Sequence, residues 1–248
     1  MVINPELPPP PVSLLTGASL FLDIDGTLLD LVDDPAAVVA DDVLRTLILH
    51  VADALAGRVA IISGRCLEQI ETIFGSVAQL VALSGSHGNE HRWRGIEAHP
   101  IRPASLDLAI NDLRECFGST PGVLIEEKSF GVAVHFRRAP HTEEDLRQLT
   151  QALAERHDLQ VQGGNMMIEL RVGGGNKGGA VRRLMGRTPM AGTRPIFVGD
   201  DLTDEPAFLT AAELGGAGVV VGDRKGSAAQ FRLGGPADVR EWLEAFVA

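Results

Sequence analysis

The sequence predicts an α/β protein with a parallel sheet covered by helices on both faces, into which a smaller α+β unit with an antiparallel sheet is inserted. Short, nearly continuous apolar runs alternate with helix-like stretches from Leu20 to Ser84 and again from Lys177 onward. Such alternation is typical of a parallel sheet that is buried on both sides. Between Pro103 and Gly175, strand-like runs come in pairs joined by short turns, which is typical of antiparallel hairpins.

The individual elements follow from local patterns. Asp41 and Asp42 precede apolar residues at helical spacing, and Gly57 ends this stretch, so we expect a helix there. In the first part of the chain we expect strands over 20–22, 59–62 and 81–84, and helices over 41–55 and 67–74. In the inserted unit we expect helices over 106–117 and 142–157, and strands over 123–128, 132–137, 159–162 and 166–172. In the last part we expect strands over 195–198 and 218–221. We expect one helix over 177–186, a second that follows the loop 199–205 and ends at 214, and a third that begins at 238.

The two changes of pattern divide the chain. We expect a proline-rich, poorly ordered arm over 1–18, a core made of 19–103 and 176–248, and the inserted unit over 104–175. The glycines at 173–175 and the segment near Pro103 are the expected crossings between the core and the inserted unit. We expect a hinge at these crossings, because they are the only links between the core and the inserted unit in this arrangement.

The composition restricts the classes of partner. The formal charge is −11, whereas binding to nucleic acid or to an anionic membrane requires a basic footprint. Cys66 and Cys116 have no paired spacing, which favours a reduced, cytoplasmic protein. The first fifteen residues lack the regions of a signal peptide, and no apolar run reaches the about 18 residues of a membrane span. We therefore expect a cytoplasmic protein that binds neither nucleic acid nor membrane. The sequence leaves the oligomeric state open, with a monomer favoured.

Two carboxylates follow the first strand, in Asp23-Ile24-Asp25-Gly26-Thr27. In an extended chain residues i and i+2 lie on the same side, about 6 to 7 Å apart, so both aspartates can act on one substrate. Taken alone, this stretch is equally well explained as a strand followed by a solvated acidic turn. Its position at the carboxyl end of a parallel strand favours function, because ligands of such sheets bind there.

A second acidic loop, over 199–205, follows the strand 195–198. Carboxylates about 4 Å apart repel by roughly 4 kcal/mol at an effective dielectric of 20. If this loop lies beside Asp23, Mg²⁺ is the natural occupant, because it prefers oxygen ligands and a phosphate. The alternative is an acidic helix start, for which Thr203, Asp204 and Glu205 are well suited. Both readings can hold together, with Asp200 as the better ligand.

Lys177 and Ser63 complete this predicted site. Lys177 begins a helix, where a cation is unfavourable to the helix dipole, so its presence suggests that it neutralises a carboxylate and a bound phosphoryl group. Ser63 stands at the end of another strand and can donate its hydroxyl to the same phosphate. The two residues thus supply the positive charge and the donor that a phosphate site needs in an acidic chain.

Taken in order, DIDGT, Ser63, Lys177 and GDDLTDE resemble the four motifs of haloacid-dehalogenase (HAD) type phosphatases. The resemblance implies a Rossmann-like core and a covalent aspartyl-phosphate intermediate. Asp23 would be the nucleophile, and Asp25 the general acid and then the general base. The implied catalytic residues are Asp23, Asp25, Thr27, Ser63 and Lys177. The implied Mg²⁺ ligands are Asp23, the backbone carbonyl of Asp25 and Asp200, with Asp201 and Asp204 as further candidates.

A denser set of strings resembles trehalose-6-phosphate phosphatases over nearly the whole chain after residue 18. These strings are Ser63-Gly64-Arg65, the run 85–90 (GSHGNE), Glu126-Glu127-Lys128, His135-Phe136-Arg137, Glu169-Leu170-Arg171 and Asn176-Lys177-Gly178. The resemblance implies that the inserted unit is a cap whose closure excludes water, and that it contacts sugar hydroxyls through Glu126, Lys128 and Glu169. Weaker candidates for the substrate interface are Gly64, Arg65, His87, Glu90, His135, Arg137, Arg171 and Asn176. Val172-Gly173 stands where the family often has a proline, which leaves the hinge conformation open.

Several alternatives remain at the level of the sequence. One alternative substrate is another sugar phosphate, of the sucrose 6-phosphate or mannosyl phosphate type. The polar strand faces of the inserted unit are also explained as solvated surface. His87-Gly88-Asn89-Glu90-His91 fits a metalloprotease string, but its glycines disfavour the required helix. Gly173-x-Gly175-x-x-Gly178 imitates a dinucleotide fingerprint, so a dinucleotide-binding protein, or a sugar-binding module without activity, is the alternative from another class. That reading leaves DIDGT unexplained.

Overall fold

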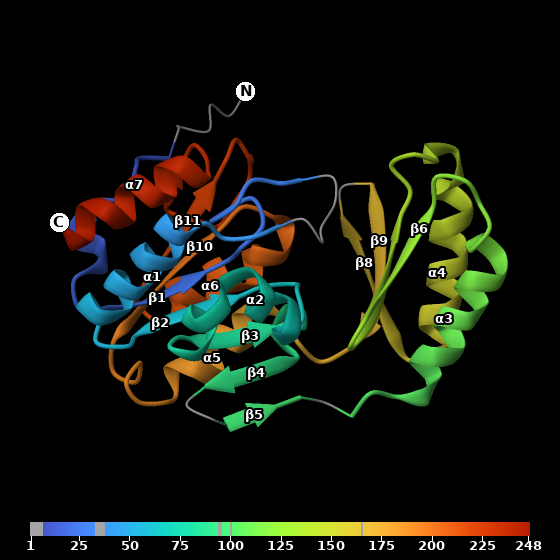
Figure 1. Cartoon of the computed structure of the whole chain (residues 1–248), viewed down its shortest axis with the longest axis horizontal. Helices are drawn as coiled ribbons and strands as arrows, with labels where there is room; N and C mark the ends of the chain where they lie inside the picture. Colours follow the sequence, from blue (N-terminus) through green and yellow to red (C-terminus); the bar gives the residue numbers. More distant parts are fainter. Residues whose placement is uncertain (1–6, 33–37, 94–95, 100, 165) are drawn as a thin grey trace. The chain divides into compact units, whose positions relative to one another are not determined.

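The structure, a computed structural model, describes residues 7–32, 38–93, 96–99, 101–164 and 166–248. The chain divides into two compact units, one made of Met1–His99 and Gly175–Ala248 and the other of Pro100–Gly174 (Figure 1). We call the first the core and the second the inserted unit. The predicted crossings, at 103–104 and 175–176, lie within a few residues of these boundaries. Each unit has its own buried apolar cluster.

The core contains an eight-stranded sheet in the order β12-β11-β10-β1-β2-β3-β4-β5. Its parallel strands are β1 (Ala18–Leu22), β2 (Val59–Ile62), β3 (Ala82–Gly85), β10 (Arg194–Gly199), β11 (Ala217–Val221) and β12 (Phe231–Leu233). An antiparallel edge is added by β4 (Glu90–Trp93) and β5 (Ile96–Ala98). Since β1 has β2 on one side and β10 on the other, the strand order reverses at β1. Ligands of open α/β sheets bind at such a point.

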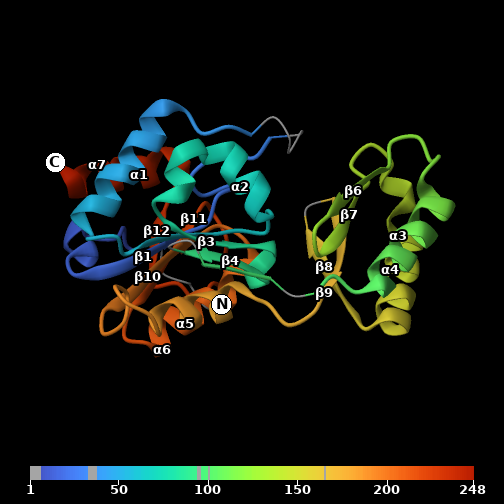
Figure 2. The same ribbon diagram turned by 60° about the horizontal axis from the view of Figure 1, so that its bottom comes forward.

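Two layers of helices cover the core sheet (Figure 2). One face packs against α1 (Asp42–Ala54), α2 (Leu67–Phe74) and α7 (Pro236–Val247), and the other against α5 (Lys177–Met185) and α6 (Glu205–Glu213). Side chains of a strand alternate between its faces: Leu20 and Leu22 join the first layer, and Phe21 joins the second. All three side chains are fully buried. This two-sided burial explains why β1 is a continuous apolar run rather than an alternating one.

The inserted unit is a four-stranded antiparallel sheet with two helices on one face (Figure 2). The strands, in the order β6-β7-β9-β8, are β6 (Leu124–Lys128), β7 (Gly131–His135), β9 (Met167–Val172) and β8 (Leu159–Gly164). The helices are α3 (Ala104–Phe117) and α4 (Glu143–His157). Val132, Val134, Ile168 and Leu170 pack against them. The residues that alternate with these, including Glu169 on β9, belong to the opposite face of the sheet.

Short 3-10 helices complete the described chain: η1 (Val12–Leu15), η3 (Gly75–Gln79), η4 (Ser86–Gly88), η5 (Pro140–Thr142) and η6 (Leu202–Asp204). His87 lies in the 3-10 helix η4 and His91 lies in strand β4, so the two histidines of the metalloprotease string do not share one helical face. The strand β9 that precedes Gly173 pairs with β7 and β8 of the inserted unit, not with the core sheet. The dinucleotide reading therefore lacks the core strand that it requires.

The structure differs from the sequence-based expectation at both edges of the core sheet. Strands β4, β5 and β12 were not predicted, because they are short and are not apolar runs: β4 is Glu-His-Arg-Trp, and β5 is exposed along its length. Residues 7–18 of the expected arm pack on the core, with Leu15 fully buried and the carbonyl of Pro8 accepting from the amide of Arg232 at 3.0 Å. Pro8 thereby occupies a backbone group of the edge strand β12. The rest of that arm, 1–6, lies outside the described residues.

Within the residues that the structure describes, no helix is both long and apolar enough to cross a membrane.

Candidate active site

The carboxyl ends of β1 and β10 bring two acidic loops together. These strands pair in parallel with Leu22 opposite Val198, and the amide of Asp23 donates to the carbonyl of Val198 at 3.0 Å. Asp23 comes directly after β1, and Asp200 directly after β10. The strand register therefore places the two carboxylates side by side, as expected for the C-terminal edge of a parallel sheet.

Lys177 lies between carboxylates in this site. Among the described residues, Asp23, Asp200 and Asp204 form a group whose carboxylate oxygens lie within 4.8 Å of one another. The Nζ atom of Lys177 lies 2.8 Å from Oδ1 of Asp23 and donates to Oδ1 of Asp204 at 2.6 Å. Its side chain is only 3% exposed. The other oxygen of Asp204, Oδ2, accepts from the amide of Asp201 at 2.9 Å. Both oxygens of Asp204 thus have protein donors.

Among the described residues, the negative charges of this site outnumber the positive ones. Burial raises the pKa of Asp23 well above its ordinary value, against the lowering effect of Lys177. Burial, followed by the charge of Asp204, raises the pKa of Asp200 to about 7. Burial by itself lowers the pKa of Lys177, but the charges of Asp204 and Asp23 together raise it above its ordinary value. One ammonium group therefore faces three carboxylates that repel one another.

This donor set suits a hard divalent cation. The three groups offer carboxylate oxygens only, which Mg²⁺ prefers over nitrogen or sulfur. Since Asp204 is already occupied by Lys177 and a backbone amide, Asp23 and Asp200 are the better ligands of the three. A cation between them would offset both the burial and the repulsion that raise the pKa of these two groups. The residues present therefore fit Mg²⁺.

Gly26 allows the first acidic loop to approach Asp200. Its φ is +76°, a conformation that favours glycine, and a Cβ there would lie 2.2 Å from Oδ2 of Asp200. The next residue, Thr27, donates its hydroxyl to Oδ1 of the same carboxylate at 3.4 Å. Both positions of the loop therefore act on Asp200: Gly26 leaves room for its side chain, and Thr27 orients it.

Asp25 is held by Arg65. The Nε atom of Arg65 donates to Oδ2 of Asp25 at 2.7 Å, and Nη2 donates to Oδ1 at 2.7 Å. Such a two-pronged arrangement is the strongest geometry for an arginine and a carboxylate. In the sequence, Arg65 was a candidate for contact with substrate. The structure adds that its guanidinium group binds the predicted acid and base.

The loop after β2, which carries Ser63, packs against a strained turn. Ser86, His87 and Gly88 all have positive φ, of 48°, 55° and 97°, and non-glycine residues in that region cost about 1 to 3 kcal/mol each. The amide of His87 donates to the carbonyl of Ser63 at 3.0 Å, and a Cβ on Gly64 would lie 2.5 Å from the His87 ring. Ser63 itself is buried. Gly64 and His87 thus shape the loop around Ser63.

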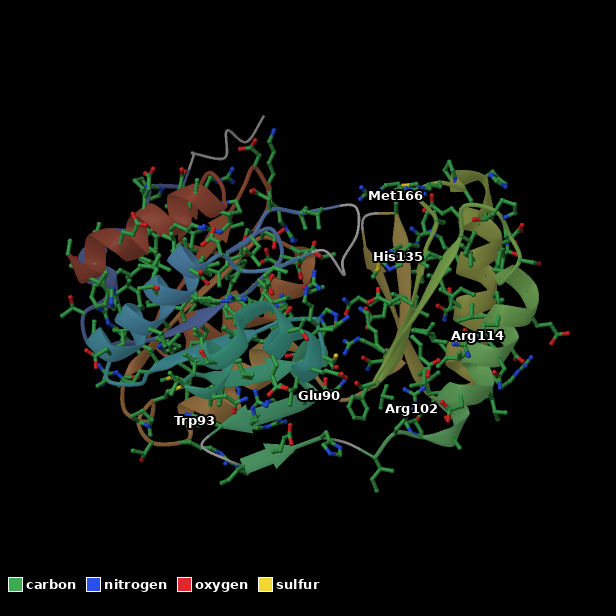
Figure 3. The ribbon with its side chains drawn as sticks, viewed as in Figure 1. Glu90, Trp93, Arg102, Arg114, His135 and Met166 are labelled. Carbon is green, nitrogen blue, oxygen red and sulfur yellow. The ribbon has the colours of Figure 1, made fainter. Side chains whose placement is uncertain are left out.

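The same turn also contacts the start of α5. A Cβ on Gly88 would lie 2.5 Å from the carbonyl oxygen of Asn176, whose side chain caps α5 by accepting from the amide of Gly179 at 2.8 Å. Glu90 is buried at the start of β4 (Figure 3) and accepts from the hydroxyl of Ser86 at 2.5 Å. Asn176 and Glu90 therefore have structural partners within the core.

The predicted sugar-binding residues form two pairs on the inserted sheet. Glu126 and Glu169 both stand opposite Ala133 of β7, on either side of it. Lys128 donates to Glu169 at 2.7 Å, and the Nε2 atom of His135 lies 2.9 Å from Oε2 of Glu126. Glu169 is 3% exposed. The sheet thus gathers two carboxylates, an ammonium and an imidazole on one face.

Other residues of the same strings are placed differently. Glu127 lies between Glu126 and Lys128 on β6. It accepts from Arg102, just before α3, at 2.9 Å and from Arg114, within α3, at 2.8 Å, and so links β6 to both (Figure 3). Arg137 follows β7 and is exposed. Arg171, on β9, is partly buried, and this burial lowers its pKa.

The role of Asp204 goes beyond the helix start that the sequence mainly indicates, because the fully buried carboxylate holds Lys177. A signal was present, because Asp201 and Asp204 have the spacing of a capping box, which the structure contains. That motif turns the Asp204 side chain back toward the start of the loop. The Asp25 to Arg65 pair had no comparable signal.

The fold is similar to that of phosphatases of the HAD superfamily. A solved structure of BT1666 from Bacteroides thetaiotaomicron, described as a phosphatase of that superfamily, matches 93% of this chain and 96% of its own with a TM-score of 0.66. At 17% identity this likeness shows the fold alone. The C-terminal domain of Candida albicans trehalose-6-phosphate phosphatase matches 98% of this chain and 99% of its own, with a TM-score of 0.83 and 26% identity.

Sequence comparison identifies the family to which the chain belongs. The model of the trehalose-phosphatase family matches residues 21–236, and the chain belongs to this family. A probable trehalose-phosphate phosphatase of Sinorhizobium fredii is 38% identical over 82% of this chain and 77% of its own length. Trehalose-6-phosphate phosphatase of Escherichia coli K12 is 34% identical over 90% of this chain and 84% of its own length. The protein is therefore a phosphatase, and the resemblance that its motifs carry is confirmed.

Proposed function

We propose that this phosphatase hydrolyses trehalose 6-phosphate to trehalose and inorganic phosphate, through an aspartyl-phosphate intermediate and with Mg²⁺ as cofactor. The observation that carries the proposal is the group formed by Asp23, Lys177 and Asp200 at the end of β1, in a chain of the trehalose-phosphatase family. Relatives named for activity on trehalose phosphate cover most of this chain.

In the first step, Asp23 is the nucleophile. One of its carboxylate oxygens bonds to phosphorus while the bond from phosphorus to the sugar oxygen breaks, and Asp25 gives its proton to that oxygen. Lys177 lies against Asp23 and neutralises part of the negative charge that accumulates there. Ser63 donates its hydroxyl to the phosphate. Trehalose leaves as a neutral alcohol.

In the second step, water hydrolyses the phosphorylated Asp23. The water oxygen bonds to phosphorus, the bond from phosphorus to Asp23 breaks, and the water proton passes to Asp25. Asp23 returns as a carboxylate and inorganic phosphate is released. Asp23, Asp200 and the backbone carbonyl of Asp25 would hold Mg²⁺, which would supply positive charge to the phosphoryl oxygens.

The inserted unit reads the sugar in this proposal. Glu126, Lys128 and Glu169 offer hydrogen-bond acceptors and donors, which a disaccharide rich in hydroxyl groups needs. The pairs from Lys128 to Glu169 and from His135 to Glu126 keep these side chains ordered before substrate binds. Arg137, which is exposed, and Arg171 are further candidates for contact with the substrate.

Phosphate release from a panel of sugar phosphates, with and without Mg²⁺, tests the proposal. We expect trehalose 6-phosphate to have the highest kcat/KM, and activity to require Mg²⁺. Asp23→Asn should abolish release, while Asp53→Asn, on the exposed face of α1, should leave it unchanged. Preference for sucrose 6-phosphate or a mannosyl phosphate would refute the substrate but retain the mechanism, and full activity of Asp23→Asn would refute the mechanism.

A further inference from the structure

Arg102, which precedes α3 (Figure 3), binds the turn that joins β6 to β7 in the inserted unit. Its Nη1 atom donates to the carbonyl oxygens of Lys128 and Ser129, each at 2.7 Å. Its Nη2 atom donates to Oδ1 of Asp107 at 2.7 Å and to Oε1 of Glu127 at 2.9 Å. One guanidinium group therefore connects the start of α3, the strand β6 and the turn.

The local sequence explains why the Arg102 side chain is free to reach the turn. Arg102 precedes Pro103, the N-cap of α3, and a residue before proline favours extended rather than helical backbone. Asp107 lies in the first turn of α3, where a carboxylate is favourable to the helix dipole. The Arg102 side chain is 28% exposed, so its charge-assisted hydrogen bonds are partly shielded from water.

The turn itself lacks the backbone conformation that favours a two-residue hairpin. Lys128 pairs with Gly131, so Ser129 and Phe130 form the whole turn. The favoured turns of this length have positive φ at one or both central positions. Both central residues belong to the described chain, and neither has a positive φ. Turns of the other common types splay the strands, so this hairpin needs support from contacts outside it.

Two segments outside the hairpin supply that support. Arg102 binds the carbonyl groups of Lys128 and Ser129, and the amide of Val172 donates to the carbonyl of Phe130 at 2.8 Å. Successive carbonyl groups along the turn thus have donors from elsewhere in the inserted unit. Phe130 is also buried, with 7% of its surface exposed. The main chain at the turn is therefore fixed, and Arg102 supplies the only charged donor group among these contacts.

Lys128 connects this turn to the sheet face that carries the predicted sugar-binding residues. Because side chains alternate along a strand, Glu127 belongs to the face toward α3 and Lys128 to the opposite face. The Nζ atom of Lys128 donates to Oε2 of Glu169 at 2.7 Å, and these two side chains are 13% and 4% exposed. Lys128 is therefore held at both ends, by Arg102 at its main chain and by Glu169 at its ammonium group.

We propose that Arg102 is a positioning residue for sugar recognition: by fixing the main chain at Lys128, it sets where the Lys128 ammonium group meets a substrate hydroxyl. The inference rests on the proposed function, in which Lys128 contacts the sugar. Arg102 binds the carbonyl group of Lys128, so its effect on the substrate passes through that residue. A misplacement of about 1 Å in such a group can cost about 100-fold in rate.

Arg102→Met should weaken recognition of the sugar. Methionine keeps an unbranched apolar stem but has no donor, so the carbonyl groups of Lys128 and Ser129 lose their partner. We expect kcat/KM for trehalose 6-phosphate to fall about 10-fold, mainly through a higher KM, because the groups that bind phosphate are unchanged. Arg102→Lys keeps the charge but lacks the planar fork, so its KM should rise less. Initial rates at saturating Mg²⁺ measure both constants.

A double-mutant cycle tests whether Arg102 acts through Lys128. Lys128→Met removes the ammonium group itself, so adding Arg102→Met to it should change kcat/KM by no more than about 2-fold. Losses from independent residues would multiply instead. Arg114→Met is the matched control, because Arg114 donates to the same Glu127 carboxylate at 2.8 Å from within α3. We expect it to behave as wild type.

The possible outcomes separate this inference from the proposed function. Losses that multiply, or a larger loss in Arg102→Met than in Lys128→Met, would overturn the inference, because Arg102 would then act through other residues or through the fold. Circular dichroism and thermal unfolding of each variant distinguish these two causes. Wild-type kinetics of Lys128→Met or of Arg102→Met would also overturn it, but would leave the reaction intact. A wild-type enzyme that releases no phosphate from trehalose 6-phosphate would refute the proposed function, and this inference with it.

Discussion

At the scale of single residues, the neighbours of Asp200 determine the pKa and the orientation of its carboxylate. Lys177 and the amide of Asp201 satisfy Asp204, so that Asp200 remains the carboxylate with the least compensation from the protein. Burial and the charge of Asp204 raise the pKa of Asp200 to about 7. The side chain is nevertheless oriented, by the Thr27 hydroxyl at 3.4 Å and by the space that Gly26 leaves open.

Gly26→Ala should therefore weaken metal binding. The added methyl would lie 2.2 Å from Oδ2 of Asp200 at a φ of +76°, so the carboxylate must move. We expect the Mg²⁺ concentration for half-maximal activity to rise at least about 10-fold, which corresponds to about 1.4 kcal/mol. Gly17→Ala is the matched control, since its φ is +70° but nothing lies within 4 Å of the added methyl. Equal Mg²⁺ dependence in both variants would contradict the role given to Gly26.

At the scale of elements, β4 carries a buried histidine, His91, outside the site. His91 is 8% exposed, and neither ring nitrogen has a hydrogen-bond partner among the described residues. Burial, followed by the charges of Arg183 and Arg187, lowers its pKa to about 4. The imidazole is therefore neutral in the folded protein at pH 7. Protonation would add a positive charge that Arg183 and Arg187 repel.

The stability of the fold should fall in acid because of His91. Its folded pKa of about 4 lies below the ordinary 6.5, so the unfolded chain binds the extra proton between these values and stability decreases as the pH falls. The shift corresponds to an upper limit of about 3 kcal/mol. Urea unfolding at pH 7.5 and pH 5 should show a smaller loss in His91→Gln than in wild type. Equal losses would show that other groups dominate, and His50→Gln, exposed on α1, is the control.

The strands and loops also show how much of the fold and of the site could be predicted from the sequence. Buried runs such as β1 and β2 were predictable, because two-sided burial leaves a continuous apolar string, and the acidic loops were placed correctly once the sheet was parallel. Strand β4 was not predictable, because its pairing with β3 is set by the turn at Ser86 rather than by its own composition. The contact of Asp25 with Arg65 joins two loops across the sheet edge, and side-chain direction there depends on backbone geometry that the sequence does not express.

At the scale of the whole molecule, charge opposes the proposed substrate. The formal charge is −11, and a phosphate monoester is itself an anion, so the long-range field slows its approach. Salt screens charges beyond about 10 Å at 0.1 M, whereas contacts inside a buried site are screened less.

Moderate salt should consequently raise kcat/KM. We expect an increase of about 2-fold between 10 mM and 100 mM NaCl at saturating Mg²⁺, with kcat little changed, because screening acts on encounter rather than on the chemical steps. Initial rates at low substrate concentration measure this. A steady decrease with salt would show instead that local cations such as Lys177 and bound metal attract the substrate from a distance.

The position of β1 has a consequence for synthesis of the chain. Strand β1 pairs with β2 on one side and with β10, Arg194–Gly199, on the other, so during translation β1 has no partner on its second side until β10 has left the ribosome. The inserted unit is one continuous stretch, Pro100–Gly174, with its own apolar cluster. Domains fold as units during translation, so this stretch can fold first while the earlier strands wait for their partner.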